Sequence, residues 1–182
     1  MRAVELVFLV GWVVFWIGWF AAAGWSKPGR QDLGRFGGMR VAILVVAVVV
    51  ARFTAVRGHA VVDDPWLHGV GLALFAAGLG LAIWARVYIG RNWGTPMSQK
   101  ADPDLVTSGP YRWVRHPIYS GVILAMIGTA VALSPVWLVS VAIVGGYFVF
   151  SATREERYLV QRFPDTYPAY KRSTKMLVPF LF

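Results

Sequence analysis

The segment 109–121 holds the densest group of side chains able to bind a small charged molecule. It reads Gly-Pro-Tyr-Arg-Trp-Val-Arg-His-Pro-Ile-Tyr-Ser-Gly. Its opening Gly-Pro pair is typical of a turn, and Pro117 suits the first residue of a helix, where a missing N–H costs nothing. His116 is then expected at or near the helix cap, beside Arg112 and Arg115. Free backbone N–H groups and the positive end of the helix dipole would join these cations, so the segment predicts a site for an anion such as a carboxylate.

A second polar group, Glu155 and Glu156, stands where a later apolar stretch ends. Two adjacent carboxylates at a bilayer boundary are costly unless they are paired or solvated. Arg154, Arg157 and Arg115 are candidate partners. Simpler interpretations exist for both segments, because Arg, Trp and Tyr commonly just anchor a protein at the membrane surface, and a charged helix end is commonly a solvated surface with weak ion pairs.

Several other kinds of site are excluded by residue content. The chain has no Cys, which rules out a disulfide scaffold, a thiolate metal site and a cysteine nucleophile. Its three histidines, His59, His68 and His116, are too scattered to predict a metal cluster. The sequence contains no phosphate-binding loop, no dinucleotide-binding glycine pattern and no His-Glu-x-x-His. We therefore expect no metal.

The composition indicates a membrane protein. Of the 182 residues, 57% are hydrophobic and 15% are charged, against about 25% charged in ordinary soluble domains. The mean hydropathy is +0.56. The formal net charge of +9 would suggest nucleic acid in a soluble protein, but in so apolar a chain it indicates anionic lipid head groups and the positive-inside rule. We expect a lipid bilayer as partner and no nucleic acid, and the sequence carries no signal for the oligomeric state.

Five apolar stretches are long enough, or nearly so, to cross a bilayer, which needs about 20 apolar residues in a helix. They are residues 3–24, 39–56, 66–89, 118–133 and 136 to about 152. The expected fold is thus all-α and polytopic, with five transmembrane helices in one domain over 1–182. Residues 1–89 form three spans, and 90–182 form a cofactor loop, a tight helical hairpin turning at Ser134-Pro135, and a helical tail. A cleaved signal peptide fits the first stretch poorly, because that stretch is long and Trp-rich.

The positive charges set an orientation for these spans. With five spans, the first loop, the third loop and the tail share one side and contain fifteen of the eighteen Lys and Arg residues. The amino end is therefore expected outside and the tail in the cytoplasm. We also expect Pro164 and Pro168 to interrupt any further regular helix in the tail, and the apolar end 176–182 to lie back on the bundle or in the interface.

The residues quoted above resemble a known family. The segment 109–121 is similar to the Arg-His-Pro-x-Tyr-x-Gly signature of isoprenylcysteine carboxyl methyltransferases, a signature shared with phospholipid methyltransferases. Leu105-Val106-Thr107 and Asn92-Trp93 fit the same pattern. The tail resembles the family's carboxyl-terminal block at Glu155-Glu156-Arg157-Tyr158-Leu159, Phe163, Tyr167, Tyr170-Lys171 and Pro179-Phe180. The resemblance covers roughly the second half of the chain, and Pro164 and Pro168 depart from the family pattern.

The resemblance implies an integral membrane enzyme that uses S-adenosylmethionine at its cytoplasmic face, between the loop and the tail. Carried over by position, the cofactor-binding residues would be Leu105, Val106, Tyr111, Arg115, His116, Pro117, Tyr119, Glu155 and Glu156. The catalytic residues would be Arg154, Glu156 and Arg157, with Arg154 the first choice and Arg157 the second for holding an acceptor carboxylate. The two departures bear on the acceptor rather than on the cofactor. The richness in Ala, Val, Gly and Arg is consistent with a bacterial or archaeal inner membrane.

Three function classes follow. The first is methyl transfer to an amphiphilic or prenylated acceptor, with carboxyl O-methylation of an isoprenylcysteine-like substrate ahead of N- or S-methylation. The second is a non-enzymatic lipid-binding membrane protein, and the third is a membrane reductase of the sterol type. The first class makes one structural prediction: Tyr111 and His116 must lie beside Glu155 and Glu156, although about forty residues separate the two segments.

Overall fold

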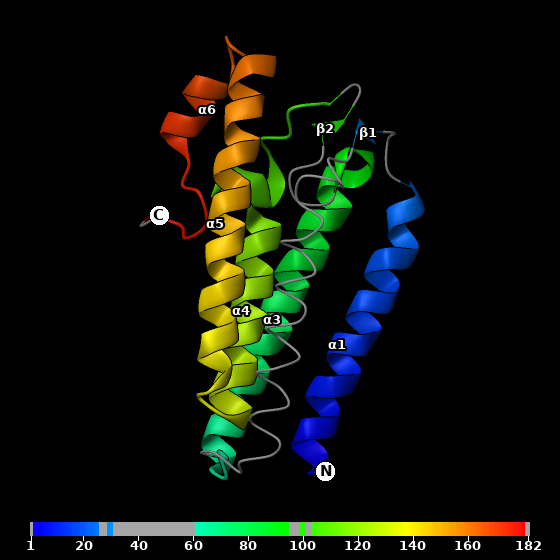
Figure 1. Cartoon of the computed structure of the whole chain (residues 1–182), viewed down its shortest axis with the longest axis vertical. Coiled ribbons are helices and arrows are strands. Elements are labelled where there is room, and N and C mark those ends of the chain that lie inside the picture. The colour runs from blue at the N-terminus through cyan, green and yellow to red at the C-terminus, as the bar shows by residue number, and fades with distance from the viewer. Residues whose placement is uncertain (1, 26–28, 31–60, 95–98, 101–102, 181–182) are drawn as a thin grey trace.

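The computed structural model describes residues 2–25, 29–30, 61–94, 99–100 and 103–180. Four long helices dominate it: α1 (Ala3–Ala21), α3 (Pro65–Ile89), α4 (Pro117–Leu133) and α5 (Trp137–Arg162). A short helix, α6 (Tyr167–Ser173), follows α5, and β1 (Gly29–Arg30) pairs antiparallel with β2 (Gln99–Lys100). Short 3-10 turns occupy Ala22–Trp25, Gly90–Asn92 and Gly109–Arg112. The expectation of a helical architecture is confirmed (Figure 1).

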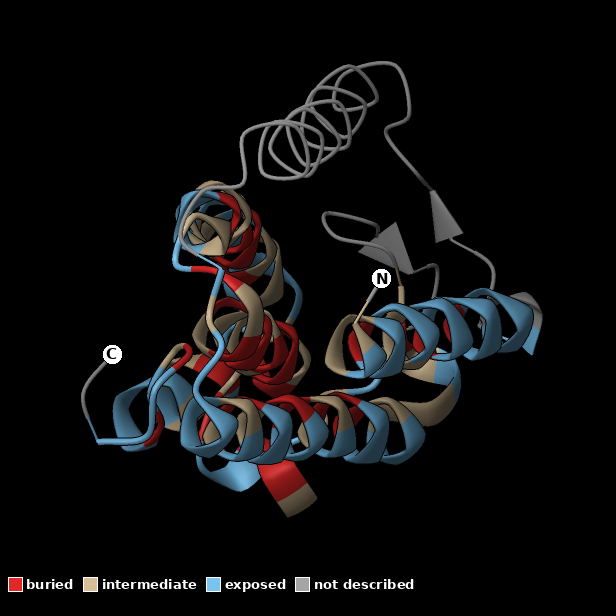
Figure 2. Ribbon diagram, turned by 90° about the horizontal axis from the view of Figure 1, so that it is seen from below, coloured by how far each residue is buried: buried red, intermediate tan, exposed pale blue. Residues whose placement is uncertain are grey.

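Three of these helices are long and apolar enough to cross a membrane: Ala3–Ala21, Pro65–Asn92 and Trp137–Arg162. The apolar α4 has 17 residues, and at 1.5 Å per residue it spans about 26 Å, somewhat less than a hydrocarbon core of about 30 Å. The predicted span 39–56 lies outside the described residues. Much of the surface of α1 and α5 is exposed (Figure 2), including large apolar side chains such as Val14, Ile17 and Phe20. Such a surface suits lipid, where apolar side chains need no cover.

Helices α3 and α4 approach closely because small residues line their contact. A Cβ atom added to Gly78 would lie 2.4 Å from the backbone N of Ala125, and one added to Gly71 would lie 2.5 Å from the carbonyl oxygen of Gly128. A Cβ atom on Gly80, by contrast, would meet nothing within 4 Å. Small residues replace hydrophobic driving force in membrane bundles by allowing extensive van der Waals contact. The loop that precedes α4 connects these two closely packed helices, so their contact fixes both of its ends.

The ends of the helices are set by local sequence. Asp64 caps α3, because its carboxylate accepts a hydrogen bond from the backbone N–H of Trp66 at 2.9 Å. The predicted interruption of the tail by Pro168 is wrong, because α6 begins at Tyr167 and carries that proline in its first turn. There a proline lacks only an N–H that would have no partner within the helix. Pro164, in contrast, lies in the break between α5 and α6.

One buried cluster reaches from the bundle to the tail. Its members include Phe15, Trp19, Tyr119, Phe148 and Leu177. The burial of Leu177 confirms that the start of the apolar end lies back on the bundle. The strand pair β1–β2 and helix α6 lie at the same end of the bundle (Figure 1). The described parts of the first and third predicted loops, residues 29–30 and 99–100, therefore lie at the same end of the bundle as the tail.

Candidate functional site

The loop before α4 is shaped by a glycine turn and a proline helix start. Gly109 has a φ of 58°, in the left-handed region that favours glycine, and a Cβ atom there would lie 2.6 Å from the ring of Tyr88. His116 is the N-cap residue of α4 and Pro117 is the first helical residue. The predicted position of His116 at the helix cap is confirmed. Its side chain is 8% exposed, so it lies inside the protein.

The tail is bound to this loop by backbone hydrogen bonds. The N–H of Arg115 donates to the carbonyl oxygen of Lys175 at 2.8 Å, and the N–H of His116 donates to that of Met176 at 3.1 Å. The hydroxyl of Tyr170 donates to the carbonyl oxygen of Tyr111 at 2.6 Å. Segments about sixty residues apart thus form one layer over the end of the bundle.

Glu156 lies at the centre of this layer, with its side chain only 2% exposed. Its Oε1 lies 2.6 Å from Nε of Arg115, and its Oε2 lies 2.7 Å from Nζ of Lys171. The guanidinium of Arg115 also donates to the carbonyl oxygens of Lys171 and Thr174. A buried carboxylate is tolerated when cations and donors surround it in this way. The ion pairs hold α6 against the loop.

Glu155 faces a different set of groups. Its Oε1 accepts hydrogen bonds from the hydroxyl of Tyr119 at 2.5 Å and from that of Ser151 at 3.1 Å. His116 lies between the two carboxylates, with Nδ1 3.6 Å from Oε2 of Glu155 and Nε2 3.5 Å from Oε1 of Glu156. The prediction that His116 lies beside Glu155 and Glu156 is therefore confirmed. Tyr111 is joined to the same layer through Tyr170.

Two buried tyrosines, Tyr111 and Tyr167, and the half-buried Tyr170 lie near the carboxylates. Burial raises the pKa of Tyr111, Tyr167 and Tyr170 above the usual tyrosine value. In the described part of the chain, the hydroxyl of Tyr167 and the Nε2 of His116 are buried without a hydrogen-bond partner. Such atoms are uncommon in folded proteins, where buried polar groups find partners.

The remaining predicted site residues lie around this centre. Arg154 and Arg157 are exposed on α5, and the guanidinium of Arg154 lies 5.1 Å from the centroid of the Phe150 ring. Of the three predicted partners, Arg115 is confirmed by its ion pair with Glu156, and the second ion pair to that carboxylate comes from Lys171.

Leu105 and Val106 are half-buried in the segment that follows the hydrogen-bonded pair Asn92 and Asp104. Among the described residues, no group of three or more His, Asp or Glu side chains could hold a metal ion.

Two residues that contact the carboxylates, Ser151 and Lys171, were not identified from the sequence. Ser151 precedes Glu155 by four residues, so helical spacing alone would have placed it on the same face of α5. Lys171 was noted only as part of a tail pattern, and its pairing with Glu156 depends on how α6 folds back. The first could have been found from the sequence, whereas the second required the tertiary structure.

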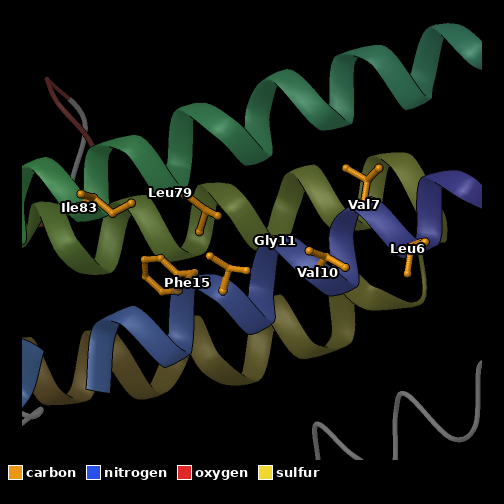
Figure 3. Close-up of a pocket in the computed structure, with 8 residues that line it drawn as sticks. Leu6, Val7, Val10, Gly11, Phe15, Leu79 and Ile83 are labelled. Carbon is orange, nitrogen blue, oxygen red and sulfur yellow. The ribbon is translucent and has the colours of Figure 1, made fainter. Parts of the chain in front are cut away.

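An apolar hollow of about 600 Å³ lies between α1 and α3 (Figure 3). It is lined by Leu6, Val7, Val10, Gly11, Val14, Phe15, Leu79 and Ile83. Phe15 also belongs to the buried cluster that contains Tyr119. A hollow with this lining suits a hydrocarbon chain rather than a polar ligand.

Known proteins resemble the chain over most of this structure. The sequence profile of the phospholipid methyltransferase family matches residues 66–166. Protein-S-isoprenylcysteine O-methyltransferase of Homo sapiens is 36% identical over 120 residues, which are 64% of this chain and 42% of the relative. Protein-S-isoprenylcysteine O-methyltransferase B of Arabidopsis thaliana is 29% identical over 147 residues, 79% of this chain and 72% of the relative. Nickel-cobalt-cadmium resistance protein NccN of Alcaligenes xylosoxydans xylosoxydans is 28% identical over 148 residues, 78% of this chain and 65% of the relative.

The chain thus spans between about two fifths and two thirds of the length of several curated relatives that it matches. The profile match includes the loop before α4, the whole of α4 and the two carboxylates on α5. These segments carried much of the resemblance in the sequence, and the resemblance to the family is confirmed, although the tail residues from Tyr167 onward lie beyond the matched range. Since the family profile covers more than half of its residues, the chain belongs to the phospholipid methyltransferase family.

Proposed function

We propose that the chain is an S-adenosylmethionine-dependent membrane methyltransferase, with carboxyl O-methylation of an isoprenylcysteine-like acceptor as its reaction. The observation that carries the proposal is the position of His116 between two carboxylates, 3.6 Å from Glu155 and 3.5 Å from Glu156. Loop and tail enclose this group at the end of an apolar bundle. A polar methyl donor could reach this site from water, and a lipid-like acceptor could reach it from the bilayer.

The residues present fit the donor's polar groups. The amino-acid end and the ribose of S-adenosylmethionine offer ammonium, carboxylate and hydroxyl groups, and among the described residues the buried His116 Nε2 and Tyr167 Oη accept or donate no hydrogen bond. In this proposal the site comprises Tyr111, Arg115, His116, Pro117, Tyr119, Glu155 and Glu156, with backbone contacts from Leu105 and Val106. When bound, the sulfonium supplies an activated methyl group.

The protein's own contribution is positioning and exclusion of water. A carboxylate acceptor needs no strong base, because it already carries the attacking electron pair. It does need a cation to hold it, and paired hydrogen bonds from an arginine suit that task. Arg154 and, second, Arg157 are proposed for this role, because both are exposed on the same turns of α5 as Glu155.

The proposed membrane arrangement has five spans, with α4 and α5 as the final hairpin, the amino end outside and α6 in the cytoplasm of a bacterial or archaeal cell. Pairing of β1 with β2 supports it, because residues 29–30 and 99–100 belong to the first and third predicted loops. The apolar hollow between α1 and α3 would receive a hydrocarbon tail of the acceptor.

An amine acceptor is the second candidate, and it would need a base to take up a proton. Glu155 suits that role better than Glu156, whose carboxylate is paired with both Arg115 and Lys171. Mild alkali separates the products, because a methyl ester is lost and an N-methyl group is retained.

The first test is calorimetric titration of the purified protein with S-adenosylhomocysteine. We expect saturable binding that His116→Ala weakens at least tenfold, because the substitution removes a buried ring with an unpaired nitrogen from the site. His68→Ala is the matched control, since His68 lies in the first turns of α3, where its Nε2 is 2.9 Å from the carbonyl oxygen of Val62. Full affinity in His116→Ala would refute the site. Absence of binding in the unmodified protein would instead favour a non-enzymatic lipid-binding protein.

A further inference from the structure

Ser151 is completely buried on α5, one helical turn before Glu155. Its hydroxyl donates to Oε1 of Glu155 at 3.1 Å, and the hydroxyl of Tyr119 donates to the same oxygen at 2.5 Å. The two hydroxyl oxygens lie 3.3 Å apart. One carboxylate oxygen is thus held by two hydroxyl groups that come from two different helices.

The acceptor of the Ser151 hydroxyl is unusual for a serine within a helix. Serine and threonine within helices commonly bond back to the carbonyl oxygen four residues earlier. Thr153, two residues further on, does so with the carbonyl oxygen of Val149 at 2.8 Å. Ser151 instead donates forward to a carboxylate, so its hydroxyl fixes a side chain rather than satisfying its own helix.

The second hydroxyl is itself held firmly. The ring of Tyr119 lies beside two nearly parallel rings, that of Phe148 at 4.4 Å and 6° and that of His116 at 5.4 Å and 4°. Two stacked neighbouring rings restrict the rotation of Tyr119. Its hydroxyl, and with it the acceptor oxygen of Glu155, therefore has a fixed place beside His116.

We infer that Ser151 is a positioning residue: together with Tyr119 it orients the carboxylate of Glu155 toward His116 and the donor. This inference rests on the proposed function, because it assigns Glu155 a contact with the bound donor. Ser151 does not touch the donor. It acts by limiting the rotamers of Glu155, so that little freedom remains to be lost on binding.

The test compares two serine-to-alanine substitutions on the same helix. Ser140 is the matched control, because it is 2% exposed on α5 and, within the described residues, its hydroxyl has no hydrogen-bond partner. Loss of one hydrogen bond to a charged group predicts about tenfold weaker binding of S-adenosylhomocysteine by Ser151→Ala. Ser140→Ala should stay within about twofold of the unmodified protein on the same scale. Equal losses in both variants, or none in Ser151→Ala, would overturn the inference.

Two further measurements separate positioning from a general packing effect. In methylation of an S-prenylated cysteine acid, Ser151→Ala should raise the KM for the donor about tenfold and leave kcat within about threefold, since the lost binding is uniform. A drop in kcat with an unchanged KM would overturn the inference.

Tyr119→Phe and the double variant complete a cycle on binding. Both hydroxyls donate to the same oxygen of Glu155. The loss of affinity in the double variant should therefore differ by about threefold from the product of the two single losses, which corresponds to about 0.7 kcal/mol. Simple multiplication of the two losses would contradict the shared role. Absence of S-adenosylhomocysteine binding in the unmodified protein would refute the proposed function itself. Equal binding by Ser151→Ala and the unmodified protein would refute only the role of Ser151.

Discussion

Arg115 is the residue on which attachment of the tail depends most, and Arg115→Met tests this directly. The substitution keeps an unbranched apolar side chain but removes the guanidinium that lies 2.6 Å from Glu156 and donates to the carbonyl oxygens of Lys171 and Thr174. Both members of the ion pair are buried, with side chains 8% and 2% exposed. Breaking a buried pair by removing one partner costs about 3–5 kcal/mol.

The lower end of that range applies, because Lys171 remains within 2.7 Å of Glu156 and its own side chain is 47% exposed. A loss of about 3 kcal/mol in the free energy of local opening raises the open population about a hundredfold. The backbone bonds from Arg115 and His116 to Lys175 and Met176 survive the substitution. The tail should therefore open more often without unfolding the bundle.

Trypsin measures this opening, because Arg172 and Lys175 are exposed tail residues whose backbone must leave the layer to be cut. Cleavage follows the open population when reclosing is faster than cutting. We expect cleavage at these two residues to accelerate about a hundredfold in Arg115→Met. Arg112→Met is the control, since Arg112 is exposed and its guanidinium lies over the neighbouring Trp113 ring. An acceleration of less than about fivefold would show that the backbone bonds alone hold the tail.

Two further predictions concern the bundle and the buried tyrosines. Gly78→Ala should lower the free energy of unfolding in detergent by about 1–3 kcal/mol, because the added Cβ would overlap backbone atoms of α4. Gly80→Ala is the control and should cost nothing, because its Cβ meets open space. Equal melting temperatures of the two variants would contradict the packing argument. Since burial raises the pKa of Tyr111, Tyr167 and Tyr170, the unfolded chain releases these protons at lower pH than the folded protein, so stability should fall as the pH rises above about 10. Tyrosinate absorbance followed alongside melting checks this, and ionisation of all tyrosines at the ordinary pH without loss of stability would count against it.

Local features of the chain were readable from the sequence. Apolar length predicted α3 from Trp66 to Ile89, and the structure begins it one residue earlier, at Pro65. For α4, the apolar stretch 118–133 and the placement of Pro117 as first helical residue both agree with the structure. The cap position of His116 followed from the same proline rule. These predictions succeed because a helix is made by contacts between residues at most four apart.

The sequence offered Arg154, Arg157 and Arg115 as candidate partners of the two carboxylates, but it could not choose among them. Arg154 and Arg157 neighbour Glu155 and Glu156 in the chain, yet adjacent residues on a helix point about 100° apart and do not face each other. The cations that meet Glu156 come from Arg115, 41 residues earlier, and from α6. The sequence alone determined which segments are polar. Only the folding of the tail over the loop decided which charges meet, because an ion pair depends on distance through space, and separation along the chain does not set that distance.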